Sequence, residues 1–303
     1  MSKLLITIVG PTAIGKTALS IQLAKHYNTQ ILSADSRQFF KEMCIGTAVP
    51  SQEELTAAPH HFIQHISIED TYSVGHYERE ALKTLSHLFT THDTLILVGG
   101  SGMYVDGLLN GLDYFPEVTP GIREELQQLH ETKGIEALQE LLKKHDPTYY
   151  KEADIHNTQR LMRALEVCLS SGKPFSSFRN QPKTPRDFKY IKIGLTAGRE
   201  IIYDRINRRV DLMMEAGLLE EVKVLLSRKH LNALQTVGYK ELFEHLEGKA
   251  SLKQAVENIK TNTRRFAKRQ LTWYRKDTSI HWFDWETPIQ QIIDSIKENT
   301  RLL

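Results

Sequence analysis

Residues near the N-terminus form a complete phosphate-binding pattern. Positions 10–17 read G-P-T-A-I-G-K-T, which agrees with G-x-x-x-x-G-K-[ST] at every fixed position. The glycines allow several backbone N–H groups to point at one anion, and a helix that starts there adds partial positive charge. A glycine-rich turn before an ordinary helix is the alternative. We predict a site for a di- or triphosphate made by Gly10, Pro11, Thr12, Ala13, Ile14, Gly15, Lys16 and Thr17, with the Thr17 hydroxyl suited to a magnesium ion.

The elements around this loop are those that the pattern requires. An apolar run over 4–9 predicts a buried strand, and apolar periodicity over 17–27 predicts a helix. Further strands are predicted at 30–33, 62–66, 95–98 and 190–195, with an edge strand at 280–283 and a helix over 72–89. This alternation predicts an α/β fold, a P-loop NTPase-like parallel sheet with helices on both faces.

Polar residues follow two of the predicted strands. Asp35 follows 30–33, and Ser101 follows 95–98 after two glycines. If these strands are parallel neighbours of the first, both side chains face the phosphate loop across one cleft. A carboxylate there can accept a proton from a nucleophile, and a hydroxyl can bind a phosphate or bridging oxygen. Each residue could instead be a helix N-cap, Asp35 for a short helix over 36–40.

The usual magnesium-binding Asp of ATP-hydrolysing proteins is missing from the predicted position. The strand at 95–98 ends in Gly-Gly-Ser, and Asp93 lies at its other end. This disfavours motor and GTPase sites and leaves the small P-loop kinases, many of which place an Asp after the second strand. His60 and His61 have no third ligand at a fixed spacing, so we expect them in a loop instead of a metal site.

Residues 115–188 interrupt the strand–helix alternation. Prolines border this stretch, and its periodicity predicts only helices, over 122–132, 135–144 and 158–170. We interpret it as a helical insertion domain, with 1–114 and 189–303 forming the core. Later core helices are predicted at 200–215, 218–227, 252–275 and 288–297.

Basic residues are concentrated in three places. Seven lie between Lys260 and Lys276 without an intervening acidic residue, interleaved with Phe266, Trp273 and Tyr274. The other two groups are Arg205, Arg208 and Arg209, and Arg160 and Arg163. Basic residues with aromatics suit a phosphate backbone and unstacked bases, although a solvated helix face is the alternative.

Composition restricts the class of protein. The 303 residues are 40% hydrophobic with a net charge of +2, which suits a packed globular protein and names no partner. No apolar run is long enough to span a membrane. The sequence contains two cysteines, Cys44 and Cys168, without zinc-site spacing, which fits a reducing compartment. Because Met1-Ser2-Lys3 leads directly into the first strand, we expect no signal peptide.

Together these residues resemble the bacterial tRNA dimethylallyltransferases, a tRNA prenyltransferase (isopentenyltransferase) family. The resemblance covers nearly the whole chain. It is carried by 10–17, Ser33-Ala-Asp-Ser-Arg-Gln38, Ile45-Gly-Thr-Ala48, Leu97-Val-Gly-Gly-Ser101, 159–167, Val237-Gly-Tyr239 and Lys268-Arg-Gln-Leu-Thr-Trp273.

The resemblance implies a reaction that explains the unusual site. The family transfers a dimethylallyl group from dimethylallyl diphosphate to N6 of the adenine 3′-adjacent to the anticodon, position 37 of tRNA, and releases diphosphate. The phosphate loop would then hold a leaving group. The resemblance also implies Mg²⁺ as cofactor, the tRNA anticodon stem-loop as partner, a cytoplasmic location and no membrane association. We expect a monomer.

The resemblance assigns roles to individual residues. It makes Asp35, Ser101 and Lys16 catalytic, with Asp35 taking the N6 proton, and adds Arg209 to the diphosphate-binding loop. Thr17 would bind the metal. The residues implied in tRNA binding are Asp35, Ser36, Arg37, Gln38, Ser101, Arg123, Gln159, Arg160, Leu161, Met162 and Arg163. Ser36 and Gln38 would hold the extruded base.

Three features depart from the family pattern. Ser101 stands where Thr is usual, Phe39-Phe40 replaces a Val-Tyr-like pair and could alter the base pocket, and the zinc finger of eukaryotic members is absent. Two other functions stay open from the residues alone. A small-molecule kinase could use the same loop, and a non-catalytic RNA-binding protein could use it as a nucleotide switch. The basic helix disfavours the first, and Asp35 beside the loop disfavours the second.

Overall fold

The computed structural model describes residues 3–301, and the chain divides into two compact units. One unit contains Met1–Asn110 and Arg186–Leu303, and the other contains Gly111–Pro185. The predicted insertion, 115–188, overlaps the second unit with slightly later boundaries at both ends. Among the described residues, no helix has the length and apolar character needed to cross a membrane.

The larger unit is built on a six-stranded sheet in which every pairing is parallel. The strand order is β3-β2-β4-β1-β5-β6. The strands are β1 Leu4–Val9, β2 Ile31–Ser33, β3 His60–His61, β4 Thr94–Val98, β5 Lys189–Thr196 and β6 Ile280–Asp284. Because β4 lies between β1 and β2, the segments that follow these three strands emerge together at one edge of the sheet.

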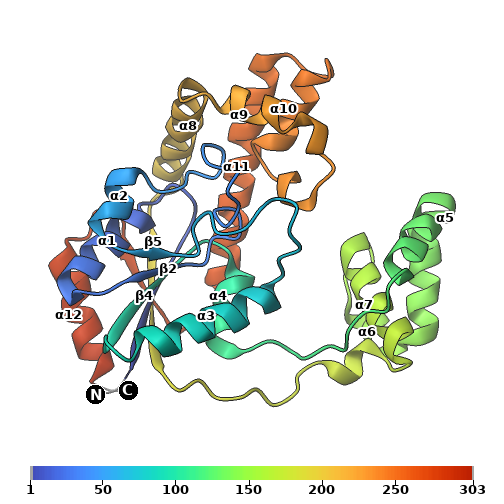
Figure 1. Ribbon diagram of the computed structural model, residues 1–303, viewed down its shortest axis with the longest axis horizontal. Helices are drawn as coiled ribbons and strands as arrows, with labels where there is room; N and C mark the ends of the chain where they lie inside the picture. The colour runs from blue at the N-terminus through green and yellow to red at the C-terminus, as the bar shows by residue number, and fades with distance from the viewer. Residues whose placement is uncertain (1–2, 302–303) are drawn as a thin grey trace. The chain divides into compact units, whose positions relative to one another are not determined.

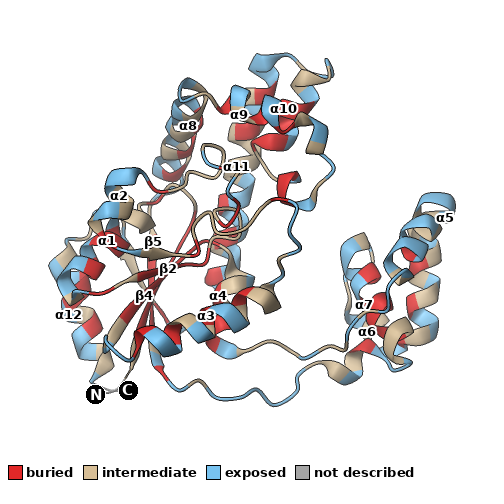
Figure 2. Ribbon diagram, in the orientation of Figure 1, coloured by how far each residue is buried: buried red, intermediate tan, exposed pale blue. Residues whose placement is uncertain are grey.

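Helices cover both faces of the sheet (Figure 1). Alternate residues of β1 point to opposite faces, as the strand period requires. Ile6 and Ile8 pack with residues of α1 (Lys16–Tyr27) and α12 (Ile289–Thr300), whereas Leu5 packs with α3 (Val74–Leu88) and α4 (Gly102–Asn110). The buried residues accordingly follow the strands (Figure 2). The predicted α/β parallel sheet is confirmed.

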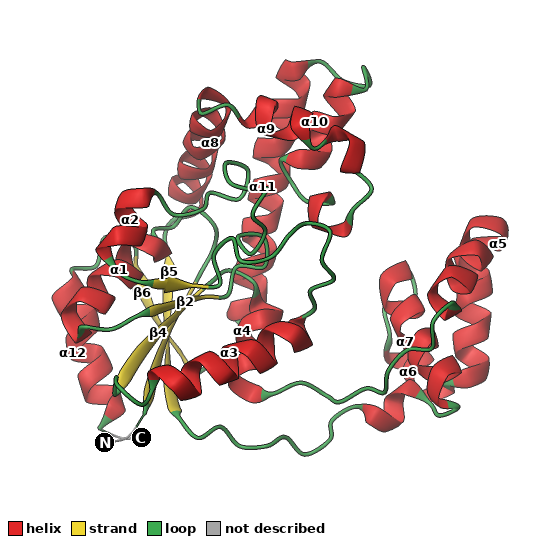
Figure 3. Cartoon of the chain, viewed as in Figure 1, coloured by secondary structure: helices red, strands yellow, loops and turns green. Residues whose placement is uncertain are grey.

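Further helices of this unit form a third apolar cluster beyond the sheet edge, which includes Val210, Leu242 and Ile259. These helices are α8 Arg199–Glu215, α9 Leu218–Val224, α10 Tyr239–Leu246 and α11 Leu252–Tyr274, with 3₁₀ turns at Leu226–Arg228 and Asn232–Leu234 (Figure 3). The short helix α2 Gln52–Ala57 instead packs through Ala57 against the cluster of Ile6 and Ile8. The short helices α2 and α10 were not predicted, because six and eight residues give too little periodicity to recognise.

The smaller unit is helical throughout its regular elements. They are α5 Ile122–His145, α6 Pro147–Glu152, α7 Thr158–Ser171 and a 3₁₀ turn at Phe175–Phe178. Gly134 has a φ of 77° inside α5, where two separate helices are predicted to meet. The core of this unit contains Leu138, Leu142 and Leu165.

Two local predictions are wrong, and one alternative is excluded. Residues 62–66 do not form a strand, because Phe62 and Gln64 take left-handed φ angles of 63° and 47°. The strand is instead His60–His61, so these histidines do not lie in a loop. No helix occupies 36–40, where the chain makes turns and Asp35 Oδ1 accepts the Arg37 N–H at 3.1 Å.

Candidate active site

The phosphate-binding loop links the central strand β1 to α1. Gly10 has a φ of 144°, and a Cβ there would come 2.5 Å from the Leu195 carbonyl oxygen of β5, so only glycine fits. Ala13 is also left-handed, with a φ of 65°. The Arg205 Nε donates to the Ala13 carbonyl at 2.7 Å, and its guanidinium stacks 4.4 Å from the Trp285 ring. The loop is therefore held in place by Arg205 of α8, which in turn contacts Trp285 after β6.

The side-chain amine of Lys16 is shielded from solvent beside this loop. Its Nζ donates to the Pro11 carbonyl at 2.8 Å. Burial lowers the pKa of Lys16 from 10.5 to about 8, with Asp35 acting to raise it and Arg209 to lower it. An anionic ligand beside Lys16 would stabilise the charged amine, so binding of the ligand and of the proton are coupled.

The lowered pKa of Lys16 predicts a pH-dependent affinity for diphosphates. An alkyl diphosphate should bind more weakly as the pH rises through about 8, because Lys16 then loses its proton in the free protein. The last ionisation of a phosphate group has a pKa of about 6, so the ligand is almost fully ionised above about pH 7 and does not contribute to a step near pH 8. Calorimetric titration between pH 6.5 and pH 9.5 measures the effect. A Lys16→Ala variant should bind weakly without a step near pH 8, and a step that persists in it would contradict the assignment.

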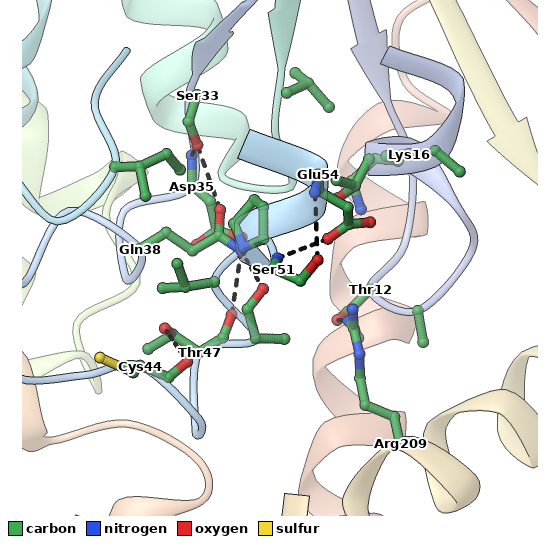
Figure 4. A pocket seen from close by; sticks show the side chains of 18 of the residues that line it. Thr12, Lys16, Ser33, Asp35, Gln38, Cys44, Thr47, Ser51, Glu54 and Arg209 are labelled. Carbon is green, nitrogen blue, oxygen red and sulfur yellow. Dashed lines mark hydrogen bonds between the residues drawn. The ribbon is translucent and has the colours of Figure 1, made fainter. Parts of the chain in front are cut away.

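Asp35 lies in the same pocket as Lys16, a cavity of about 1020 Å³. Figure 4 shows Thr12, Lys16 and Arg209 on one side of this cavity and Asp35, Gln38 and Thr47 on the other. Arg209 Nη1 donates to Thr12 Oγ1 at 3.2 Å, and burial lowers the pKa of Arg209. The structure thus gathers a carboxylate, an amine and a guanidinium around one cavity.

Ser101, which follows β4, lies beside Ser36, which follows β2. The Ser101 hydroxyl accepts the Ser36 N–H at 3.1 Å, and the two hydroxyls lie 3.1 Å apart. This hydroxyl therefore joins the two segments that follow the strands.

Arg37 and Gln38 are held by the protein itself. The Gln38 amide donates to the carbonyls of Ala48, at 2.8 Å, and Thr47, at 3.2 Å. Arg37 Nη1 donates to the Ala233 carbonyl at 3.1 Å. Both side chains thus fix loops around the pockets, a role that the residue types alone do not reveal.

Glu221 is a further residue that sequence reasoning missed. Its carboxylate accepts the N–H groups of Cys44, Ile45 and Gly46 and the hydroxyl of Tyr239, at 2.6 to 3.0 Å. It holds the 44–46 turn against α9 and α10. The sequence gives no signal for this contact because the partners are about 175 positions apart.

A second cavity of about 800 Å³ adjoins the first. Thr12, Asp35 and Gln270 line both cavities. The second is also lined by Ser36, Ser101, Arg269 and three exposed apolar side chains, Met103, Phe266 and Trp273. The first cavity is suited to an anion, and the second offers aromatic rings, a cation and hydroxyls for a planar polar group.

The Phe39-Phe40 pair does not line either cavity. Phe39 is fully buried and stacks on Tyr77 with ring centroids 5.3 Å apart, and Phe40 packs in the third apolar cluster. Because both rings belong to apolar cores, any effect of this pair on the base pocket would be indirect, through packing.

The predicted tRNA-contact residues of the helical unit divide into two groups. Leu161 and Met162 are buried in the core of this unit, where they hold α7 in place, and their contact with tRNA stays a prediction. Arg160 and Gln159 are exposed. Arg123 and Arg163 are partly exposed and share the buried Glu166, at 2.6 Å and 3.3 Å. The family motif groups all these residues together, although the period of 3.6 residues in a helix turns some of its positions toward the core.

Only some of the basic residues between Lys260 and Lys276 are exposed and could contact tRNA. Lys260 pairs with Asp211 at 2.7 Å, and Arg264 donates to Asn207 at 2.8 Å. These two residues connect α11 to α8. The exposed members of the stretch are Arg265, Lys268, Arg269, Arg275 and Lys276.

Comparison with known proteins identifies the family. The sequence model of the IPP transferases matches residues 38–277. The chain is 59% identical over 297 residues to a tRNA dimethylallyltransferase of Christiangramia forsetii, covering 98% of each chain. This chain belongs to the IPP transferase family.

Solved structures of IPP transferases share the fold. A tRNA isopentenylpyrophosphate transferase of Bacillus halodurans superposes with a TM-score of 0.73 and 35% identity, covering 100% of this chain and 99% of the other. A eukaryotic dimethylallyltransferase acting on tRNA gives a TM-score of 0.83 at 27% identity, covering 99% of this chain and 79% of that one. The match to the family model begins at Gln38, so the phosphate-binding loop and Asp35 lie outside it.

Proposed function

We propose that this chain is a tRNA dimethylallyltransferase that transfers a dimethylallyl group to N6 of the adenine 3′-adjacent to the anticodon and releases diphosphate. The full-length relatives bearing that name support the activity. The observation that carries the site assignment is the pair of adjoining cavities that share Asp35. The diphosphate occupies the cavity of the phosphate-binding loop, and the adenine enters the other.

The leaving diphosphate is stabilised by positive charge around the first cavity. Lys16 and Arg209 provide two cations, and the loop provides N–H groups at the N-terminus of α1. Negative charge grows on the diphosphate as the allylic C–O bond breaks, so these preorganised groups favour the transition state. No phosphoryl group moves in this reaction.

Thr17 fits a role in binding Mg²⁺. It lines the same cavity as Lys16, and Mg²⁺ is usually held by one or two protein oxygens together with phosphate oxygens and water. No cluster of three His, Cys, Asp or Glu side chains suited to a metal occurs in residues 3–301, so the phosphate oxygens would supply most ligands. When bound, the metal would add positive charge beside the diphosphate.

Asp35 serves as the general base. The exocyclic amine of adenine is a poor nucleophile, because its lone pair is delocalised into the ring. A carboxylate at the junction of the cavities can accept an N6 proton as the N–C bond forms, which prevents positive charge from building on nitrogen. Ser36 and Ser101, joined through their hydroxyls, lie at the adenine side and can orient the base, which must leave the helical stack to react.

Contacts with the tRNA backbone are proposed for exposed basic residues of both units. These are Lys268 and Arg269 in α11, Arg275 and Lys276 directly after it, and Arg160 and Arg163 in α7. The anticodon stem-loop is the part of tRNA that places the target adenine in the second cavity. We also expect the enzyme to be monomeric and cytoplasmic.

Affinity for tRNA should depend steeply on salt. Replacing Lys268, Arg275 and Lys276 by Gln should weaken binding and lower the slope of log affinity against log salt by roughly one unit for each lost phosphate contact. Lys297→Gln, an exposed change on α12, is the matched control. Filter binding at several salt concentrations measures both quantities. An unchanged affinity and slope in the triple variant would identify this basic stretch as a solvated surface.

The activity is tested by incubating the chain with tRNA, Mg²⁺ and labelled dimethylallyl diphosphate, without ATP. Label should enter tRNA, and a tRNA whose position 37 is not adenine should receive none. ATP-dependent phosphorylation of a small molecule would support a kinase instead. Binding of tRNA without any transfer would support a nucleotide-switched RNA-binding protein.

A further inference from the structure

A buried glutamine of α11 connects the two halves of the site. The Gln270 Oε1 accepts the Thr12 N–H of the phosphate-binding loop at 2.8 Å. Its Nε2 donates to the Gly100 carbonyl at 2.9 Å, immediately before Ser101. Only 6% of Gln270 is exposed. One amide group thus joins a loop that follows β1 to a segment that follows β4.

The fit around this amide leaves little freedom. A Cβ on Gly100 would come 2.3 Å from Gln270 Nε2, and one on Gly102 would come 2.4 Å from Trp273 Nε1. Trp273 Nε1 in turn donates to Asp106 Oδ2 of α4 at 2.8 Å. The two glycines therefore let α11 approach the chain after β4, and the Trp273 contact fixes the register of the helix.

Gln270 also lies where the two proposed subsites meet. It lines both cavities, at the wall where the allyl group would pass from diphosphate to adenine. Its two partners belong to the segments that carry Lys16 and Ser101. A change at Gln270 would therefore alter the spacing between the donor and the acceptor without removing a group that binds either.

We infer that Gln270 is a positioning residue, which sets the distance and orientation between the leaving diphosphate and the attacking adenine. This inference rests on the proposed function. Transfer needs the reacting atoms at roughly 3–3.5 Å with aligned orbitals, and a misplacement of about 1 Å can cost about a hundredfold in rate. Gln270 also directs the Thr12 N–H away from the anion, so other loop N–H groups bind the diphosphate.

The test compares Gln270→Met with wild type in single-turnover prenyl transfer at saturating tRNA and dimethylallyl diphosphate. Methionine has a similar length but makes neither hydrogen bond. We expect the rate to fall about 10- to 100-fold, the range expected for misplacement, with both dissociation constants within about threefold of wild type. Gln254→Met, an exposed change near the start of α11, is the matched control and should keep the wild-type rate.

A second variant separates positioning from simple stabilisation. Gln270→Glu can still accept the Thr12 N–H, but its ionised form cannot donate to Gly100 and its buried charge should lower the melting temperature. The rate is therefore compared well below that temperature, where the folded variant should again be slow. A wild-type single-turnover rate in either folded variant would overturn the inference. A loss confined to diphosphate affinity would also overturn it, since Gln270 would then shape one subsite only. Failure of the wild-type chain to transfer label would instead count against the proposed function.

Discussion

Asp35→Asn should reduce the single-turnover rate of prenyl transfer by about 10²–10⁴-fold, the usual contribution of a general base. The substitution keeps the side-chain oxygen that accepts the Arg37 N–H, so the turn after β2 should survive. Affinity for tRNA should change little, because the proposed cationic contacts lie elsewhere. Rapid-quench measurement of labelled tRNA gives the rate, and filter binding gives the affinity.

Two further variants make the Asp35 prediction specific. Asp35→Ala removes both the base and the turn, so it should lose activity and also melt at a lower temperature. Asp284→Asn is the matched control, because Asp284 accepts the Glu286 N–H in the same type of turn, is exposed and lies outside both cavities. If Asp35→Asn retains near wild-type activity while Asp35→Ala loses mainly stability, Asp35 only holds a turn.

Lys16→Ala should lower the transfer rate about a hundredfold, which corresponds to about 3 kcal/mol of barrier for one lost contact to a developing anion. The protein should remain folded. Burial already disfavours the charged amine, as the lowered pKa of Lys16 shows, so its removal relieves a desolvation cost. Stopped or quenched single-turnover kinetics at saturating dimethylallyl diphosphate measure the rate, and thermal melting measures the fold.

Lys25→Ala supplies the comparison for Lys16. Lys25 is an exposed lysine on the same helix, so its removal changes the net charge equally without touching the cavity. It should keep the wild-type rate. Normal turnover in Lys16→Ala at saturating diphosphate would remove Lys16 from the mechanism.

The core of the fold was predictable because its signals are local. The run of apolar residues in β1 and the pattern that follows it together specify a strand, a loop and a helix. The rule that ligands bind beyond the carboxyl ends of parallel strands then predicts that Asp35 and Ser101 lie at the site. The structure places both at that edge, although their catalytic roles stay predictions.

Other features were not predictable because they depend on tertiary contacts. Gln270 reaches Thr12 across 258 positions of sequence, and nothing near Gln270 indicates which loop it meets. Leu161 and Met162 lie in a motif that the resemblance associates with tRNA, but the packing of α7 decides which side chains are exposed. The apolar residues at 62–66 resemble a strand, yet two left-handed residues bend the chain there.

The central feature of the proposed mechanism is that the phosphate-binding loop holds a leaving diphosphate. The most direct measurement quantifies both products, prenylated adenine in tRNA and released diphosphate, in a reaction free of nucleoside triphosphates. We predict equal amounts of the two products and no orthophosphate. Transfer that requires ATP, or release of orthophosphate in place of diphosphate, would contradict this mechanism.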